Sequence, residues 1–319
     1  MTKWSLALAM LLAAPAVGQT LPAPQPAAAD LLAPEPTAAE TVLAFENAQT
    51  RMTVPVTIDT RGPWRFVVDT GAERSVVSRE LAQVLGLPAG PFVRVISMTG
   101  AERVPTVHVG SLGVSTIASP AIVAPALEAH DLGAVGLVGI DALQGHSVVI
   151  DFDRDRMTLR PSRRRRAPPP SREEIVVTAK SLFGQLIVTD ARWRNKPIAV
   201  VIDTGAPMSI GNTALLALIK NARAEGAVSL ISATGGTLNA DAITVDSLQV
   251  GGIGFSGVRM AIADAAPFER FNLSNRPAML LGMDVLRLFR RVQIDFANRN
   301  IRFTLPRGAV PDDAAIGTL

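Results

Sequence analysis

The sequence predicts an all-β protein of two pseudo-symmetric lobes with a few short helices. Segments of alternating polarity are separated by turn signals about every 8 to 12 residues, which is typical of proteins made of many short strands. The 25 Gly and 23 Pro supply many turns, and one stretch of the chain is repeated later in the same order. With 319 residues, the chain is long enough for two domains that each bury a core.

The first 18 residues are typical of a secretory signal peptide. Lys3 supplies a positive start, an apolar stretch runs from Ser5 to Val17, and Gly18 ends a small-residue cleavage motif. We therefore expect export to the periplasm of a Gram-negative organism, or secretion from another organism. An uncleaved membrane anchor is the alternative. No later segment reaches about 18 uninterrupted apolar residues, so stable membrane insertion of the mature chain is not expected.

Two segments of biased composition divide the rest of the chain. One near the N-terminus is rich in Ala and Pro, and one near the middle combines repelling arginines with stiff prolines. The predicted organisation is a signal peptide (1–18), a linker (19–41), a first lobe (42–161), an inter-lobe linker (162–174), a second lobe (175–306) and a tail (307–319).

The positive charge of the chain is concentrated in one segment. The formal net charge is +3, and it would be −3 without Arg160, Arg172 and the run Arg163 to Arg166. No aromatic residues are interleaved there, so no nucleic-acid partner is expected. The run is interpreted as a solvated linker, with a protease-sensitive site or attraction to anionic lipid headgroups as alternatives.

The residue types that hold metals and cofactors are sparse. The chain has no cysteine, which excludes disulfides, thiol nucleophiles and thiolate metal sites. His108, His130 and His146 lie far apart and match no short metal-ligand spacing. We expect neither a metal nor another cofactor.

An Asp-Thr-Gly-Ala tetrapeptide occurs twice, each time after an apolar strand. The match extends from the lead-ins VTIDTRGPWRFVVDTGA and VTDARWRNKPIAVVIDTGA, through ISMTGAERV and ISATGGTLN, to LVGID and LLGMD. The first Asp lies 70 positions before the matching Gly of LVGID, and the second lies 79 positions before that of LLGMD. The second half is therefore expected to carry an extra loop within residues 264–277.

Few segments carry a helical pattern. Residues 78–86 and 212–224 follow the two tetrapeptides and are expected to form helices capped by Ser78 and Asn212. Short helices are also expected after the two Gly-x-Asp elements. The remaining segments alternate in polarity or turn, as strands do.

Two carboxylates at strand ends, related by a pseudo-two-fold axis, can share one proton. Because Asp69 and Asp203 cannot both ionise at contact distance, one serves as general base and the other as general acid for a water molecule that attacks a peptide carbonyl. Ala72 and Ala206 place no hydroxyl beside the carboxylates. We therefore expect higher pKa values and activity at milder pH than for a Ser or Thr variant.

The other residues of the tetrapeptides have expected roles in the same loops. Gly71 and Gly205 permit a tight turn, because they have no Cβ to clash. The hydroxyls of Thr70 and Thr204 can lock the two loops together.

These motifs resemble the retropepsin-type aspartic peptidases, specifically bacterial single-chain members with both lobes in one polypeptide. The resemblance covers residues 42–306 and rests on the doubled Asp-Thr-Gly-Ala strand and on the paired hydrophobic-hydrophobic-Gly elements. It implies two retropepsin- and pepsin-like β-barrel lobes with the active site at the lobe interface. It also implies catalytic roles for Asp69 and Asp203, with Gly139 and Gly282 in elements that support their loops.

By the same resemblance, two Thr-Gly turns are candidates for the tips of β-hairpin flaps that close over an extended substrate. The chain has no tyrosine, unlike the pepsin branch, whose flap carries one. Its Gly-x-Asp elements also lack the Arg of the viral version, which puts dimer contacts through such an Arg in doubt. The flap candidates are Thr99, Gly100, Thr234, Gly235 and Gly236.

Three other motifs are interpreted as structural. Asp141 and Asp284 follow the supporting glycines and are expected to cap short helices rather than to form a second dyad. The segment 252–257 fits G-x-G-x-x-G, but no helical pattern follows, so a glycine-rich hairpin is expected. Asp59 and Thr60 lack the following glycine and are placed in a hairpin turn.

The sequence therefore predicts an aspartic endopeptidase that acts on a polypeptide substrate. A catalytically silent peptide-binding or scaffolding protein with the same fold is the alternative. We expect a monomer with the dyad inside one chain, because the two halves differ by an insertion. A homodimer in which each half pairs with its own copy is the other arrangement that the linker length permits.

Overall fold

The structure is a computed structural model that describes residues 41–44, 46–48, 51–114, 117–162, 169–219, 222–307 and 315–317. The predicted signal peptide, most of the linker 19–41, the arginine run and most of the tail lie outside the described residues.

The first lobe is a mostly β structure with three short helices. Its central sheet has the strand order β6-β7-β10-β5-β11-β4-β3-β8-β9, with β2 paired to β3. The elements are β2 Glu46–Ala48, β3 Arg51–Ile58, β4 Arg61–Val68, β5 Val76–Ser78, α1 Arg79–Leu85, β6 Ala89–Ser97, β7 Gly100–Val109, β8 Leu112–Val114, β9 Ile117–Ser119, β10 Ile122–Leu127, α2 Ala129–Leu132, β11 Gly136–Val138 and α3 Ile140–Leu143.

The second lobe repeats this arrangement. Its strands follow the order β18-β19-β22-β17-β23-β16-β15, which matches β6-β7-β10-β5-β11-β4-β3, and β20 pairs with β15 as β8 pairs with β3. The predicted fold class of two similar β-rich lobes is confirmed. The elements are β15 Gln185–Trp193, β16 Lys196–Ile202, β17 Ile210–Gly211, α4 Thr213–Leu218, β18 Arg223–Ile231, β19 Thr237–Val245, β20 Leu248–Val250, β21 Ile253–Ser256, β22 Val258–Ile262, α5 Ala266–Arg270, β23 Ala278–Leu281 and α6 Met283–Leu286.

A shared sheet joins the two lobes. Its order is β1-β13-β12-β24-β25-β14, and β12 pairs with β24 in antiparallel register at its centre. Outward from this central pair, β13 corresponds to β25 and β1 corresponds to β14. The sheet therefore follows the same pseudo-two-fold symmetry as the two lobes. Its strands are β1 Thr41–Ala44, β12 His146–Asp151, β13 Arg156–Pro161, β14 Glu174–Leu182, β24 Arg291–Asp295 and β25 Asn300–Thr304.

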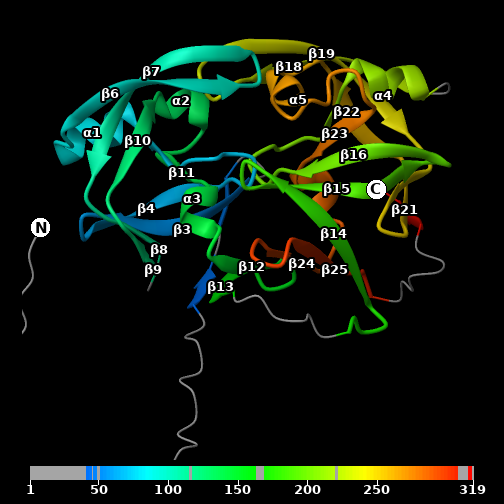
Figure 1. Cartoon of the computed structure of the whole chain (residues 1–319), viewed down its shortest axis with the longest axis horizontal. Coiled ribbons are helices and arrows are strands. Elements are labelled where there is room, and N and C mark those ends of the chain that lie inside the picture. The colour runs from blue at the N-terminus through cyan, green and yellow to red at the C-terminus, as the bar shows by residue number, and fades with distance from the viewer. Residues whose placement is uncertain are drawn as a thin grey trace, which may run out of the picture. The chain divides into compact units, whose positions relative to one another are not determined.

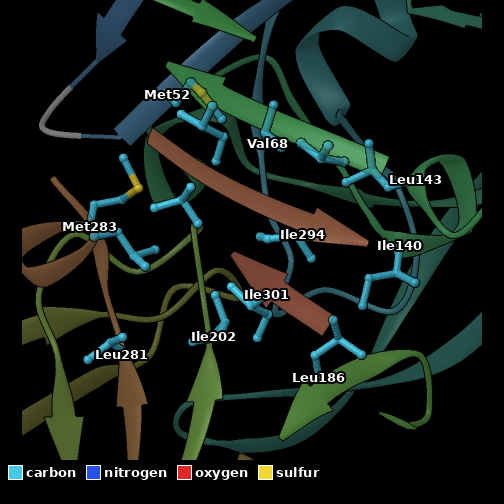
Figure 2. Close-up of a cluster of buried hydrophobic side chains, with 14 of the residues drawn as sticks. Met52, Val68, Ile140, Leu143, Leu186, Ile202, Leu281, Met283, Ile294 and Ile301 are labelled. Atoms are coloured by element: carbon cyan, nitrogen blue, oxygen red, sulfur yellow. The ribbon is translucent and has the colours of Figure 1, made fainter. Parts of the chain in front are cut away.

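The largest buried cluster draws on both lobes and on the shared sheet. Figure 2 shows Val68 and Ile202, which directly precede the two aspartates, close to Ile294 and Ile301 of the shared sheet. Each of these four side chains is 0 or 1% exposed. The strand ends that carry the aspartates are therefore packed into the common core, which limits their movement.

The helices that follow the two tetrapeptides are capped as predicted. The Ser78 hydroxyl accepts a bond from Leu81 N–H, and α1 ends at Gly86, whose φ of 61° suits glycine. The Asn212 side chain accepts a bond from Leu215 N–H at the start of α4. The prediction that this helix continues to residue 224 is wrong, because β18 begins at Arg223 and pairs along its length with β19.

Two other differences between the halves concern the second lobe. The extra loop predicted within residues 264–277 contains α5 and the turn that follows it. The segment predicted as a tail contributes β26 (Ala315–Gly317), which pairs in parallel with β21. The glycine-rich segment 252–257 forms β21 and its turns, as expected.

Two hairpins lie opposite the shared sheet. Figure 1 shows the β6–β7 and β18–β19 hairpins together at the top of the view, with β12, β24 and β25 toward the bottom. Thr99 and Gly100 lie where β6 turns into β7, and residues 234–236 lie between β18 and β19. The predicted flap candidates are thus placed at hairpin tips.

Candidate active site

The two predicted catalytic aspartates lie side by side at the ends of equivalent strands. Asp69 follows β4 and Asp203 follows β16, and their side chains are hydrogen-bonded to each other. Their backbone N–H groups donate to Val138 O and Leu281 O, each at 3.0 Å. The parallel strands β11 and β23 thus fix the start of each loop.

The glycines of the tetrapeptides are required by the closeness of the two carboxylates. A Cβ on Gly71 would lie 2.7 Å from Cγ of Asp203, and a Cβ on Gly205 would collide with Cγ of Asp69. Neither glycine has a positive φ. Glycine is therefore needed here because a Cβ would clash, as expected, and the group that it would meet is the opposite carboxylate.

Backbone N–H groups point at each carboxylate. Asp69 Oδ1 accepts bonds from Gly71 N–H at 2.8 Å and Ala72 N–H at 2.9 Å. Asp203 Oδ1 accepts bonds from Gly205 N–H at 2.9 Å and Ala206 N–H at 3.1 Å. These four bonds orient the carboxylates and favour their charged forms.

The two threonines cross-link the loops. Thr70 Oγ1 donates to Ile202 O at 2.9 Å and accepts from Thr204 N–H at 3.1 Å. In return, Thr204 Oγ1 donates to Val68 O at 2.8 Å and accepts from Thr70 N–H at 3.1 Å. Both threonines are buried, so this reciprocal lock holds the strand ends in register without competition from water.

The two aspartates differ in their electrostatic surroundings. Burial raises the pKa of Asp203 to about 7, and the negative charge of Asp69 contributes to this rise. Burial also raises the pKa of Asp69, but the N–H groups of Gly71 and Ala72, the positive charge of Arg51 and a hydrogen bond from Asp203 act in the opposite direction. The proton of the pair is therefore held preferentially by Asp203.

Arg51 and Gln185 occupy equivalent places beside the dyad. Arg51 lies two residues before Thr53, which pairs with Val67, and Gln185 lies two residues before Ile187, which pairs with Val201.

The contacts of these two side chains differ. Arg51 Nη2 donates to Leu132 O at 2.5 Å, and its charge interacts with both aspartates. Gln185 Nε2 donates to Gly71 O at 3.0 Å, inside the opposite active-site loop. A pseudo-symmetric scaffold thus carries a charged side chain on one side of the dyad and a neutral one on the other.

The supporting elements hold the loops through two serines. Ser75 Oγ donates to Asp141 Oδ1 at 2.7 Å and accepts from Gly139 N–H at 3.0 Å. Ser209 repeats this arrangement with Asp284 and Gly282.

The side chains of Asp141 and Asp284 therefore bridge to the active-site loops. The glycines themselves occupy the N-cap positions of α3 and α6, without a side-chain cap. Each carboxylate also accepts a bond at 2.9 Å from the N–H of the next residue in the helix, Ala142 or Val285. The two aspartates therefore help to cap the short helices, as expected, and they bind Ser75 and Ser209 in addition.

Sequence reasoning missed several of these residues. Ser75 and Ser209 each lie six positions after the dyad aspartate, so the internal repeat contained a signal for them. Arg51 and Gln185 differ from each other, and a repeat comparison gives no signal for such a pair.

The hairpin tips contact each other across the lobes. Ser97 Oγ lies 2.9 Å from Thr234 Oγ1, and Thr234 Oγ1 donates to Glu102 Oε1 at 2.9 Å. A Cβ on Gly236 would collide with the Thr99 hydroxyl, which indicates close packing of the two tips. The flap candidates are thus brought together in one place.

Other possible sites are less developed in the part of the chain that the structure describes. Glu80, Glu128 and His130 lie close enough to share a metal ion. Glu80 already accepts a bond from Ala129 N–H, and Glu128 pairs with Arg79. None of these contacts involves the dyad. Within the described ranges, no helix is both long and apolar enough to cross a membrane.

Comparison with known proteins finds two family models in tandem. The family described as gag-polyprotein putative aspartyl protease matches residues 54–145, and the family described as aspartyl protease matches residues 189–285. No curated protein matches the chain. Each matched segment contains one Asp-Thr-Gly-Ala loop and one supporting glycine, so the chain belongs to the retropepsin-like aspartyl proteases, with two such domains in one polypeptide.

Proposed function

We propose that the protein is an aspartic endopeptidase in which Asp69 and Asp203 activate water. The observation that carries this proposal is the hydrogen-bonded carboxylate pair, in which the pKa of Asp203 is raised to about 7 and Arg51 favours the charged form of Asp69. One ionised and one protonated carboxyl group in contact supply a base and an acid at the same pH.

In the first step, Asp69 is the base and Asp203 is the acid. As the water oxygen bonds to the peptide carbonyl carbon, Asp69 accepts a proton from water and Asp203 gives its proton to the carbonyl oxygen. A tetrahedral diol results, with Asp69 protonated and Asp203 ionised. The four backbone N–H groups described above hold both carboxylates in place during the exchange.

In the second step, the two aspartates reverse their roles. Asp69 gives its proton to the amide nitrogen as the carbon–nitrogen bond breaks, and Asp203 takes a proton from one hydroxyl of the diol. The products are a carboxylic acid and an amine, and the pair returns to its starting state. Neither a metal nor a covalent intermediate is needed for this cycle.

We further propose that the working dyad forms within one chain. The hydrogen bond between the two side chains, the reciprocal threonine lock and the central β12–β24 pair all support this arrangement. Residues at the hairpin tips would cover a polypeptide bound in extended form over the dyad.

Substitution of each aspartate by asparagine tests both proposals. Asp69→Asn and Asp203→Asn should each lower the rate of peptide cleavage by at least roughly 10²- to 10⁴-fold, because each removes one acid–base group. Asp59→Asn is the matched control, since it makes the same change in an Asp-Thr turn between β3 and β4. Cleavage of an unfolded protein is measured by gel, and folding by circular dichroism.

The same variants separate the possible arrangements. If each half paired with its own copy in a homodimer, a single substitution would leave the other dyad intact and about half of the activity. Peptide binding without cleavage by the parent protein at every pH from 3 to 8 would instead favour a silent scaffold.

We also propose that the protein acts after export. The N-terminal residues that motivate this lie outside the described part of the chain, and the proposal rests on their sequence pattern. In a Gram-negative host, the processed protein should appear in the osmotic-shock fraction. Retention of the unprocessed chain in the membrane fraction would instead indicate an uncleaved anchor.

A further inference from the structure

The two hairpin tips have nearly the same sequence and differ at one apolar position. The tip of the β6–β7 hairpin contains Ser97, Met98 and Thr99, and the tip of the β18–β19 hairpin contains Ser, Ala233 and Thr at the equivalent places. Both Met98 and Ala233 are partly buried. The two tips therefore share the types of their polar residues but bring apolar side chains of different size to the site.

Each tip packs on the opposite lobe. Met98 contacts a buried cluster of the second lobe that includes Val201, Phe268 and Leu280. We refer to this cluster as the second-lobe wall. The backbone of Met98 is bound to the second lobe as well, because Ala266 N–H at the start of α5 donates to Met98 O at 3.1 Å.

The other tip makes the reciprocal contact. Ala233 packs against a cluster of the first lobe that includes Val67, Leu132 and Leu137, which we refer to as the first-lobe wall. A Cβ on Gly235 would lie 2.7 Å from Asp131 Oδ2 in α2, so this tip also approaches the first lobe closely.

Both walls adjoin the dyad. Val67 and Val201 lie two residues before Asp69 and Asp203, and Leu137 and Leu280 pair with them in the parallel strands that support the dyad. The walls are thus buried apolar clusters that reach the strands carrying the two aspartates. Substrate side chains on either side of the cleaved bond would need the apolar surface that the tips now cover.

We propose that the Met98 side chain occupies the place on the second-lobe wall where a substrate side chain would bind, so that substrate must displace it. The smaller Ala233 side chain covers less of the first-lobe wall. This inference rests on the peptidase function proposed above, and it assigns the two tips unequal roles. Because the hydroxyls of Ser97 and Thr234 contact each other, displacement of one tip disturbs the other.

A buried hydroxyl supports the interpretation of the closed tips as a resting state. Ser232 is 0% exposed, and its Oγ has no hydrogen-bond partner among the described residues. The equivalent Ser97 does have one. An unpaired buried hydroxyl favours any rearrangement that gives it a partner, such as opening of the tip or contact with a substrate backbone.

The first test measures the resting state and needs no activity. In ligand-free protein, exchange of the Ala266 amide reports on the bond to Met98, and the Asn272 amide, which donates to Glu269 O in the same segment, is the internal reference. Met98→Ala should speed Ala266 exchange by about tenfold relative to Asn272. Met98→Leu, which keeps the apolar volume, should restore the slow exchange. Equal exchange in all three proteins would overturn the proposal.

The second test measures displacement by substrate. The probes are quenched fluorescent peptides with Ala, Leu or Phe on either side of the cleaved bond. Met98→Ala should lower KM about fivefold for peptides with Leu or Phe on one side, with kcat within about twofold, because a larger share of the protein is open. Ala233→Met is the matched variant and should raise KM for large residues on the other side.

The two tests separate failure of this inference from failure of the peptidase proposal. A higher KM for Met98→Ala would mean that Met98 contacts bound peptide, and it would overturn the role as an occupant. If no variant cleaves any peptide, the peptidase proposal fails, and the exchange of Ala266 still decides whether Met98 holds the tip on the second lobe.

Discussion

At the scale of single residues, the two halves are most alike in the groups that touch the dyad and differ in the side chains beside it. The threonine hydroxyls, the glycines and the N–H donors are matched across the pseudo-two-fold axis. Arg51 and Gln185 are not matched. A symmetric dyad would share its proton equally, so one charged residue is enough to give the two aspartates different roles.

Replacement of Arg51 by glutamine should remove this difference. Arg51→Gln takes away a positive charge that favours the charged form of Asp69, so the pKa of Asp69 should rise. Because the base must be ionised, the acidic limb of the pH profile of kcat/KM should move to higher pH.

Arg61→Gln is the matched control for this substitution. Arg61 Nη2 also donates to a carbonyl at the end of a helix, Leu85 O, at 2.8 Å, and it does not interact with the dyad in the described structure. An acidic limb that moves equally in both variants, or in neither, would contradict the role assigned to Arg51.

At this scale, the residues predicted correctly from the sequence are those that are identical at equivalent positions of the two repeats. The aspartates, threonines and glycines of the dyad loops are found together in the structure because both copies are constrained by the same contacts. Arg51, Gln185 and Met98 act through differences between the copies. Their significance depends on which residues face them across the lobes, and spacing along the chain does not contain that information.

At the scale of elements, the supporting strands and helices determine how precisely the dyad loops are placed. Gly139 illustrates the constraint, because a Cβ there would lie 2.6 Å from the carbonyl oxygen of Arg74. Backbone atoms of a loop held by Ser75 cannot move away without disturbing Asp69. The glycine is therefore required by close packing between two backbone segments.

Gly139→Ala should destabilise the protein by about 2 kcal/mol or more and should lower activity. Gly145→Ala is the matched control, because a Cβ at Gly145 meets nothing within 4 Å, and its effect should stay within about 0.5 kcal/mol. Urea unfolding measures both variants. Similar stability of the two would show that the loop adapts to a side chain at Gly139.

The helix after the second dyad loop shows why element boundaries were harder to predict. Residues 212–224 have a helical pattern, yet the helix ends at Leu218 and Arg223 already belongs to β18. Pairing of β18 with β19 outweighs the local preference of these residues. The strand in the tail was also missed, because Ala315–Gly317 pairs with a segment about 60 positions earlier in the chain.

At the scale of the whole molecule, the dyad makes stability depend on pH. The pKa of Asp203 is about 7 in the folded protein and about 3.9 in an unfolded chain. Between these values, the folded state binds the additional proton, so the stability that Asp203 contributes is fully present below about pH 4 and is lost as the pH rises through 7. The loss from Asp203 is on the order of 4 kcal/mol.

Asp203→Asn should flatten this dependence, because asparagine does not titrate. Tm measured by circular dichroism at pH 4, 5, 6 and 7 should fall with pH in the parent protein and in Asp59→Asn, but less in Asp203→Asn. Carboxyl groups such as Asp151 have lowered pKa values and titrate below this range. A parent Tm that rises steadily from pH 4 to pH 7 would contradict the protonated state assigned to Asp203.

Because of the way the shared sheet is built, none of its strand pairings depends on the covalent connection between the lobes. The strands β1, β13 and β12 all precede the inter-lobe linker, and β14, β24 and β25 all follow it. In the sheet, β13 and β14 are four positions apart, about 19 Å, whereas the residues between them reach about 40 Å when extended. Two polypeptides cut within the linker retain every strand pairing. The connection then serves mainly to keep the two halves at a high effective concentration.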